Sequence, residues 1–243
     1  MIKSVRLALV ILGMISLPLT AAASAQPHPL TVAVSGGFSP AFASLIPTLS
    51  QQLNYPIVMN RLPVAPLYAD LADGSAQFDL IVTGKSVQLD QLSASGMIIA
   101  ESIRHIARSS VVLWCPNPAV RLRVRLQDTL NDPNIRKIAA SRTDSPVGQL
   151  IQRSVRIPAA IETIYAEHSL HAWRLAKSQQ VDCAFTMIGM MQSTDQYQAI
   201  YQHYIEMIAA IPTNSTQTEL AERLLDLLDS PMIRARIKTF GYF

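Results

Sequence analysis

Apolar residues recur at two spacings along the chain, and the alternation between them predicts strands and helices in turn. Residues 30–34 form a short apolar run, and apolar residues then recur at helical spacing from Phe42 to Leu49. The same criteria predict further strands at 55–59, 78–82, 109–115, 137–140 and 181–186, and further helices at 66–72, 145–155, 168–179, 215–228 and 231–240. This order predicts an α/β protein with parallel strands flanked by helices.

The pattern restarts at Ser109, which divides the chain into two α/β units. The C-terminal segment holds two predicted helices without strands of their own, so we expect it to return to the first unit. Residues 29–106 with 200–243 should therefore form one lobe and residues 108–195 the other, with a separate sheet in each. Ligands of open parallel sheets bind outside the carboxyl ends of the strands, so two facing units predict a ligand cleft between the lobes.

The N-terminus has the pattern of an export signal. Lys3 and Arg6 precede an apolar run over 7–19, and Ala23-Ser24-Ala25 is a small-x-small cleavage site. The apolar run is shorter than the roughly 20 residues that a membrane span needs, which disfavours the alternative of an uncleaved anchor. We therefore expect residues 1–25 to be a signal peptide and the remaining chain to be periplasmic.

Composition disfavours nucleic acid as a partner and leaves open whether the two cysteines form a disulfide. The net charge is +3, and without residues 1–25 the chain has 18 basic and 17 acidic residues, so it is nearly neutral. No basic run interleaves with aromatic residues, and we expect no nucleic-acid binding and a monomer. Cys115 and Cys183 could form a disulfide in an oxidising compartment or remain two buried thiols.

Two turns share a signature that favours anion binding. Ser39-Pro40 and Ser145-Pro146 each follow a predicted strand, and each serine reads as the N-cap of a helix. The free N–H groups and the dipole of a helix N-terminus attract anions, although the same pattern also occurs simply as a cap.

The sequence contains no pattern typical of catalysis or metal binding. There is no G-x-S-x-G, H-E-x-x-H or P-loop sequence. Asp79 and Asp182 stand at strand ends, where a carboxylate more often caps neighbouring backbone groups than acts as an acid or base. His168 and His171 have no evident partner ligands. We expect no cofactor and no enzymatic activity.

Several segments together resemble the periplasmic molybdate- and tungstate-binding proteins. They are Leu71-Ala72-Asp73-Gly74, residues 78–85, 109–116, 138–148 and 166–185, and the ending Phe240-Gly241-Tyr242-Phe243. The resemblance spans almost all of the chain after the predicted signal peptide. It implies a two-lobed type II periplasmic binding protein fold, with two α/β lobes joined by two crossover strands. It also implies a solute-binding component of an ABC importer, which binds a small anion and delivers it to an inner-membrane permease.

The resemblance also implies which positions bind the ligand, and this chain carries different residues at several of them. The family's two serines fall on Gly37 and near Ala65, its two backbone N–H donors near Val147 and Ser169, and its tyrosine on Met187. Three side-chain donors are therefore absent. Other hydroxyl groups could replace them in part, Lys85 adds a cation, and Phe38 could make the pocket more apolar. The candidate ligand-binding residues are Ser35, Gly37, Phe38, Ser39, Ala65, Thr83, Lys85, Ser145, Val147, Ser169 and Met187.

Three functions follow from these observations. The first is a receptor for a small anion such as a molybdate-like oxyanion. The second is a receptor of the same fold for an organic anion, a carboxylate or a phosphonate, and the third is a secreted enzyme that uses the fold. Because each missing donor leaves part of a bare oxyanion unpaired, we expect weaker molybdate binding than is usual in the family.

Overall fold

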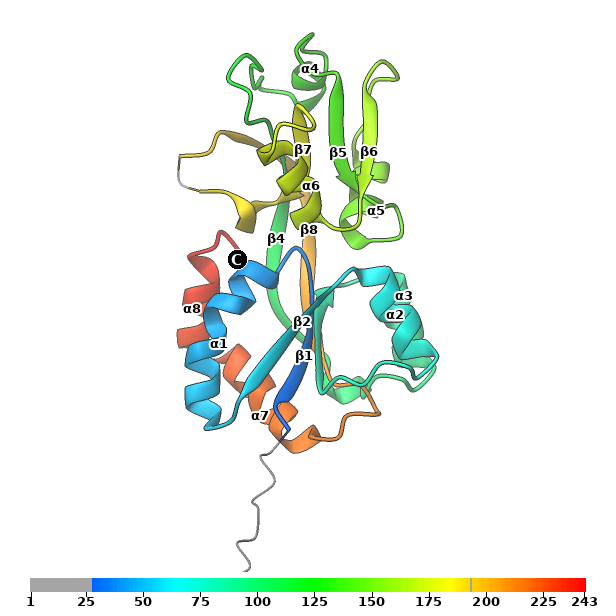
Figure 1. Cartoon of the computed structure of the whole chain (residues 1–243), viewed down its shortest axis with the longest axis vertical. Helices are drawn as coiled ribbons and strands as arrows, with labels where there is room; N and C mark the ends of the chain where they lie inside the picture. The colour runs from blue at the N-terminus through cyan, green and yellow to red at the C-terminus, as the bar shows by residue number, and fades with distance from the viewer. Residues whose placement is uncertain (1–27, 193) are drawn as a thin grey trace, which may run out of the picture.

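The computed structural model describes residues 28–192 and 194–243, so the predicted signal peptide lies outside the described residues. Two lobes lie one above the other, joined by two long strands, β4 (Arg104–Trp114) and β8 (Tyr197–Ala210) (Figure 1). This arrangement confirms the two-lobed α/β fold with two crossover strands.

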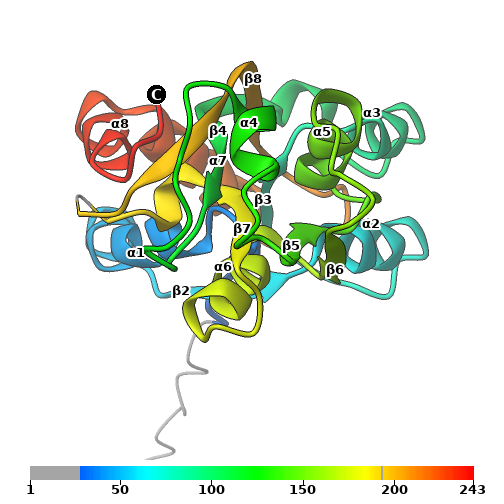
Figure 2. The ribbon, with the colours of Figure 1, turned by 90° about the horizontal axis from the view of Figure 1, so that it is seen from above.

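Each lobe combines parallel strands with covering helices. Lobe 1 contains β1 (Leu30–Ser35), β2 (Ile57–Leu62), β3 (Leu80–Gly84), α1 (Ser39–Leu53), α2 (Val64–Ala72), α3 (Val87–Ala94), α7 (Thr218–Asp229) and α8 (Pro231–Lys238). Lobe 2 contains α4 (Leu126–Leu130), β5 (Lys137–Ser141), α5 (Pro146–Ser154), β6 (Glu162–Ala166), α6 (Ser169–Lys177) and β7 (Cys183–Met187). Seen from above, α7, α8 and α1 lie on one side of lobe 1, and α2 and α3 on the other (Figure 2).

Hydrogen bonding runs through one sheet of the order β2-β1-β3-β8-β4-β7-β5-β6. The expectation of a separate sheet in each lobe is therefore wrong. The reason is that β4 and β8 pair with each other in antiparallel fashion from Arg104↔Ala209 to Trp114↔Tyr197, so the two connecting strands belong to both lobes. The residue limits of the two lobes stay a prediction.

Alternation along the strands of lobe 1 creates two cores. Val32 and Val34 point to one face of the sheet, where they pack with Phe42 of α1 and Leu224 of α7. Ala33 points to the other face, into the cluster formed by α2 and α3. The sheet is thus buried on both sides, as its near-continuous apolar strands require.

The C-terminal segment is tied to the crossover strand. Phe243 N donates to Arg108 O at 3.0 Å, and Arg108 N donates to Phe243 O at 2.6 Å. This pairing anchors the last residues at the level where the two lobes meet, close to α1 (Figure 1). The expectation that the C-terminal helices return to the first unit agrees with the packing of α7 and α8 on α1.

Two open questions from the sequence are settled by the fold. Cys115 and Cys183 form a disulfide that joins the end of β4 to the first residue of β7. Asp79 accepts hydrogen bonds from the N–H and the hydroxyl of Thr31, both at 2.8 Å. Asp182 likewise accepts from two backbone N–H groups, those of residues 136 and 137. Both carboxylates therefore cap backbone groups.

Candidate functional site

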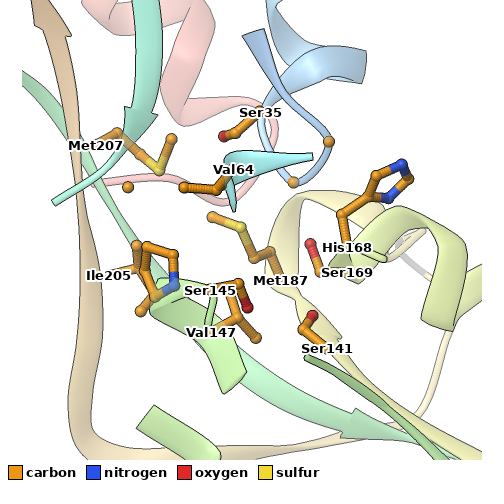
Figure 3. A pocket seen from close by; sticks show the side chains of 14 residues that line it. Ser35, Val64, Ser141, Ser145, Val147, His168, Ser169, Met187, Ile205 and Met207 are labelled. Carbon is orange, nitrogen blue, oxygen red and sulfur yellow. The ribbon is translucent and has the colours of Figure 1, made fainter. Parts of the chain in front are cut away.

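A small cavity lies between the lobes, where the carboxyl ends of β1 and β3 face those of β5 and β7 (Figure 3). Its volume is about 30 Å³. A single water needs roughly 10–15 Å³ on this measure, and pockets for drug-sized ligands have roughly 300–1,000 Å³, so this cavity suits an ion-sized solute. The lining residues are Ser35, Gly36, Gly37, Val64, Gly84, Ser141, Ser145, Pro146, Val147, His168, Ser169, Met187, Ile205 and Met207.

Three glycines of lobe 1 allow the lobes to approach closely. A Cβ on Gly36 would lie 2.6 Å from Nδ1 of His168, and a Cβ on Gly84 would lie 3.1 Å from Cγ of Pro146. A Cβ on Gly37 would overlap the sulfur of Met187 and lie 2.8 Å from the Ser169 hydroxyl. Side chains of lobe 2, together with Ile205 of β8 at Gly84, therefore fill the space that side chains at these three positions would occupy.

The helix α5 begins at the cavity with a side-chain cap. Ser145 Oγ accepts a hydrogen bond from Gly148 N at 3.1 Å and donates one to Arg142 O at 2.7 Å. This confirms Ser145 as an N-cap and occupies its hydroxyl. Within the described part of the chain, no hydrogen bond uses the Val147 N–H, so it remains free to serve a ligand.

The helix α6 begins at the same cavity. His168 Nδ1 accepts from His171 N at 3.0 Å, and Thr186 Oγ1 donates to Ser169 O at 3.0 Å. The Ser169 N–H and hydroxyl have no partner among the residues that the structure describes. Two helix N-termini of lobe 2 thus present free donors to one small space.

The turn before α1 is organised differently. Phe38, not Ser39, occupies the N-cap position, and none of the described side chains caps this helix. Ser39 Oγ instead donates to Gly36 O at 3.0 Å and accepts from Arg61 Nε at 2.7 Å. The expectation that Ser39 is an N-cap is therefore wrong, because the helix begins one residue earlier than the Ser-Pro pattern indicates.

Tyr242 supports this turn from the far end of the chain. Its hydroxyl donates to Gly37 O at 2.8 Å, and its ring packs edge-on against Phe38 with centroids 5.0 Å apart. Complete burial raises the pKa of the Tyr242 hydroxyl well above its usual range, so it stays protonated as a donor. The position of Gly37 at the cavity thus depends on the C-terminal residues.

His168 is the titratable residue that lines the cavity. Partial burial lowers its pKa, and the nearby His171, Arg61 and Arg174 lower it further, while Glu167 opposes them. Because Nδ1 accepts the His171 N–H, the proton of the neutral ring is on Nε2. In the parts of the chain that are described, no group of three or more His, Cys, Asp or Glu residues is placed to hold a metal.

The structure brings six of the eleven candidate residues to the cavity. These are Ser35, Gly37, Ser145, Val147, Ser169 and Met187. The other five lie elsewhere. Phe38 is fully buried behind the turn, the Ser39 hydroxyl bonds within lobe 1, and Thr83 Oγ1 lies 3.3 Å from the Tyr68 hydroxyl. Ala65 lines a neighbouring groove, and the Lys85 ammonium lies 3.9 Å from the Glu206 carboxylate.

Sequence reasoning missed eight lining residues. Ser141 directly follows the predicted strand 137–140, so the rule for carboxyl ends of strands could have found it, and His168 is the first residue of a predicted helix. Ile205 and Met207 come from β8. The sequence analysis predicted no strand there, so no sequence pattern pointed to these two residues. The remaining four are Gly36, Val64, Gly84 and Pro146.

The fold agrees with solved binding proteins. The periplasmic molybdate-binding protein of Azotobacter vinelandii has a TM-score of 0.74 at 20% identity, over 88% of this chain and 98% of that one. The sulfate-binding protein SubI of Mycobacterium tuberculosis has a TM-score of 0.70 at 14% identity, over 88% and 86%. The protein PEB3 of Campylobacter jejuni, with L-phospholactate bound, has a TM-score of 0.67 at 14% identity, over 88% and 98%.

Two further comparisons concern the sequence and the membrane. No curated protein matches the chain. None of the helices in residues 28–192 and 194–243 is both long and apolar enough to cross a bilayer. The sequence model of the bacterial extracellular solute-binding proteins matches residues 30–243, and the chain therefore belongs to this family of solute-binding components of ABC transporters.

Proposed function

We propose that this protein is the periplasmic receptor of an ABC importer and that it binds a small anion in the cavity between its lobes. The observation that carries the proposal is the convergence of free N–H and hydroxyl donors at Val147 and Ser169, where α5 and α6 begin. Helix N-termini favour negative charge, and the small volume favours an ion over a sugar or a peptide. The ligands named for similar proteins are molybdate, sulfate and L-phospholactate, and all three carry an oxyanion group.

Apolar lining favours an oxyanion that carries an organic group. Met187, Met207, Ile205, Val64 and Pro146 border the same space as the donors. These side chains offer no hydrogen bonds to the oxygens of a bare tetrahedral ion, whereas they can contact carbon atoms favourably. A small phosphonate or carboxylate therefore fits this lining better than molybdate, and it forms our second candidate ligand class.

The remaining parts of the proposal rest on the family and on the geometry. A receptor of this family delivers its ligand to an ABC permease, and we propose that this one acts as a monomer after removal of residues 1–25. We assign it no catalytic step. The imidazole at the cavity uses its Nδ1 acceptor to cap α6, so its remaining nitrogen is a donor and not a base.

Isothermal titration calorimetry on the purified protein tests this proposal. The panel contains molybdate, tungstate, sulfate, methylphosphonate and L-phospholactate, with glucose and glycine as uncharged and zwitterionic controls. We expect an organic oxyanion to bind more tightly than molybdate, and neither control to bind. Nanomolar molybdate binding would contradict the preference for organic groups. Failure of every anion to bind would contradict the anion receptor itself.

A further inference from the structure

The hydroxyl of Ser141 is a buried polar group without a partner, and it stands at the cavity. Ser141 is the last residue of β5 and has only 1% of its surface exposed. Its Oγ makes no hydrogen bond among the described residues. A buried hydroxyl without a partner destabilises the folded protein, so its retention calls for an explanation from outside the unliganded chain.

The backbone around Ser141 holds this hydroxyl in a fixed place. Ser141 pairs with Ala166 of β6, and the following N–H, that of Arg142, donates to Ala166 O at 3.0 Å. The start of α5 packs directly on the strand end, because a Cβ on Gly148 would lie 2.7 Å from Ser141 O. The hydroxyl therefore has little freedom to find another partner.

Ser141 lies beside the donors already described. It lines the cavity together with Val147 and Ser169, and Figure 3 shows its side chain below Ser169, with the oxygen on the side that faces the other lining side chains. Ser145, although close by, has already used its hydroxyl within the turn. Ser141 thus supplies a donor at the point where Ser145 cannot.

We propose that the Ser141 hydroxyl donates a hydrogen bond to an oxygen of the bound anion, as a specificity-determining residue of the site. This inference rests on the proposed function and names a ligand contact that the resemblance did not include. It gives lobe 2 three donor positions, at residues 141, 147 and 169.

A second cavity of about 330 Å³ behind α5 also touches Ser141 and needs its own control. It is bordered by Thr163 and Gln152, which do not line the interlobe cavity. If the Ser141 hydroxyl served that space, a change of Thr163 would affect binding as a change of Ser141 does. Ser154 offers a matched control of another kind, since its Oγ is also buried without a partner but at the opposite end of α5.

The test measures anion affinity and stability of Ser141→Ala, Ser154→Ala and Thr163→Val by calorimetry and thermal unfolding. The titrants are methylphosphonate, L-phospholactate, sulfate and molybdate. We expect Ser141→Ala to weaken the best of these by about ten- to a hundredfold, the range for a hydrogen bond to a charged group. Its melting temperature without ligand should not fall, because an unpartnered hydroxyl is removed. Ser141→Thr, which keeps the hydroxyl, should retain most of the affinity.

The outcomes separate this inference from the proposed function. Wild-type binding that Ser141→Ala leaves unchanged overturns the role of Ser141 alone. An equal loss in Thr163→Val or Ser154→Ala also overturns it, because the effect would then be general to lobe 2. Failure of the wild-type protein to bind any of the four anions overturns the proposed function, and the ligand contact with it.

Discussion

The two turns that face each other across the cavity have similar sequences but are held in place by different contacts. The β5–α5 turn of lobe 2 is stabilised by its own residues, since Ser145 bonds to both Gly148 N and Arg142 O. The β1–α1 turn of lobe 1 depends on distant residues. Tyr242 donates to Gly37 O, and Arg61 donates to Ser39.

This difference indicates separate roles for the two lobes. Lobe 2 presents donors on turns that local hydrogen bonds already fix, and such preorganised groups lose little freedom when a ligand binds. Lobe 1 contributes glycines that receive side chains of lobe 2. Its turn adds bonds from distant residues, among them Tyr242, to the local bond from Ser39 to Gly36 O. The comparison therefore predicts that remote changes disturb lobe 1 and that local changes disturb lobe 2.

The largest effect should come from Tyr242→Ala. The ring is buried and packs on Phe38, and truncation of a buried aromatic residue costs about 3–5 kcal/mol of unfolding free energy. Tyr242→Phe, which removes only the hydrogen bond to Gly37 O, should cost about 1 kcal/mol. Urea denaturation measures both values. Equal and small losses in the two variants would show that the C-terminal segment does not support the turn.

The contact between Gly37 and Met187 should give the next largest effect. Gly37→Ser places atoms where the Met187 sulfur lies, and such overpacking costs about 1–3 kcal/mol. In a background of Met187→Ala the same change should cost less, and the added hydroxyl should then strengthen binding of molybdate and sulfate. A double-mutant cycle in stability, with calorimetry on all four proteins, measures the coupling. Additive effects would mean that the two residues do not compete for space.

A smaller effect is expected from the local cap of lobe 2. Ser145→Ala removes the acceptor for Gly148 N and should cost about 1 kcal/mol of unfolding free energy. Ser145→Asp keeps an acceptor at the N-cap and should recover most of this loss. Chemical denaturation of the wild type and the two variants measures whether their unfolding free energies follow this order. If Ser145→Asp is no more stable than Ser145→Ala, the cap is not the source of the stability.

The smallest effect concerns the pH dependence of stability that His168 causes. Burial and nearby cations lower the pKa of His168 below its ordinary value of 6.5, so the unfolded chain binds its proton first as the pH falls. The stability that the neutral ring contributes is complete above pH 6.5 and is lost as the pH falls toward the lower folded pKa. Protonation of Nδ1 would also remove the cap of α6.

His168→Asn tests this pH dependence. Asparagine keeps a cap acceptor but does not titrate, so the melting temperature of the ligand-free variant should decrease less than that of the wild type between pH 7.5 and 5.5. His203→Asn is the control, since His203 is exposed and does not line the cavity. Parallel pH profiles of wild type and His168→Asn would contradict the prediction.

Much of the fold was predictable because strong local patterns coincide with real elements. The strand at Leu30–Ser35, the helix that begins at Pro146 and the last helix at Pro231–Lys238 all follow apolar periodicity or a Ser-Pro start. By contrast β6 and β8 were not predicted. Both are partly exposed strands with polar residues among the apolar ones, and their pairing partners are far away in the sequence.

The candidate site was predictable to the extent that strand ends and helix starts define it. Ser35, Ser145 and Ser169 could be placed at the cavity because each lies at such a junction. Ser39 shows the limit of this rule, because the helix begins one residue before the serine and the hydroxyl meets Arg61 instead. Lys85 shows another limit. Its ammonium group lies near the carboxylate of Glu206 on β8, a strand that the sequence did not predict, and this negative charge offsets the cation that Lys85 was expected to add.

The sequence by itself determined the α/β class, the two units and the helix starts that we propose as anion donors, because these features arise from neighbouring residues and from local hydrogen bonds. Only the tertiary structure decided which side chains share the cavity. The overlap of position 37 with Met187, the support of Gly37 by Tyr242 and the unpartnered hydroxyl of Ser141 all join segments that are far apart in the chain. Packing between such segments depends on the shape of the whole molecule, and no local pattern encodes it.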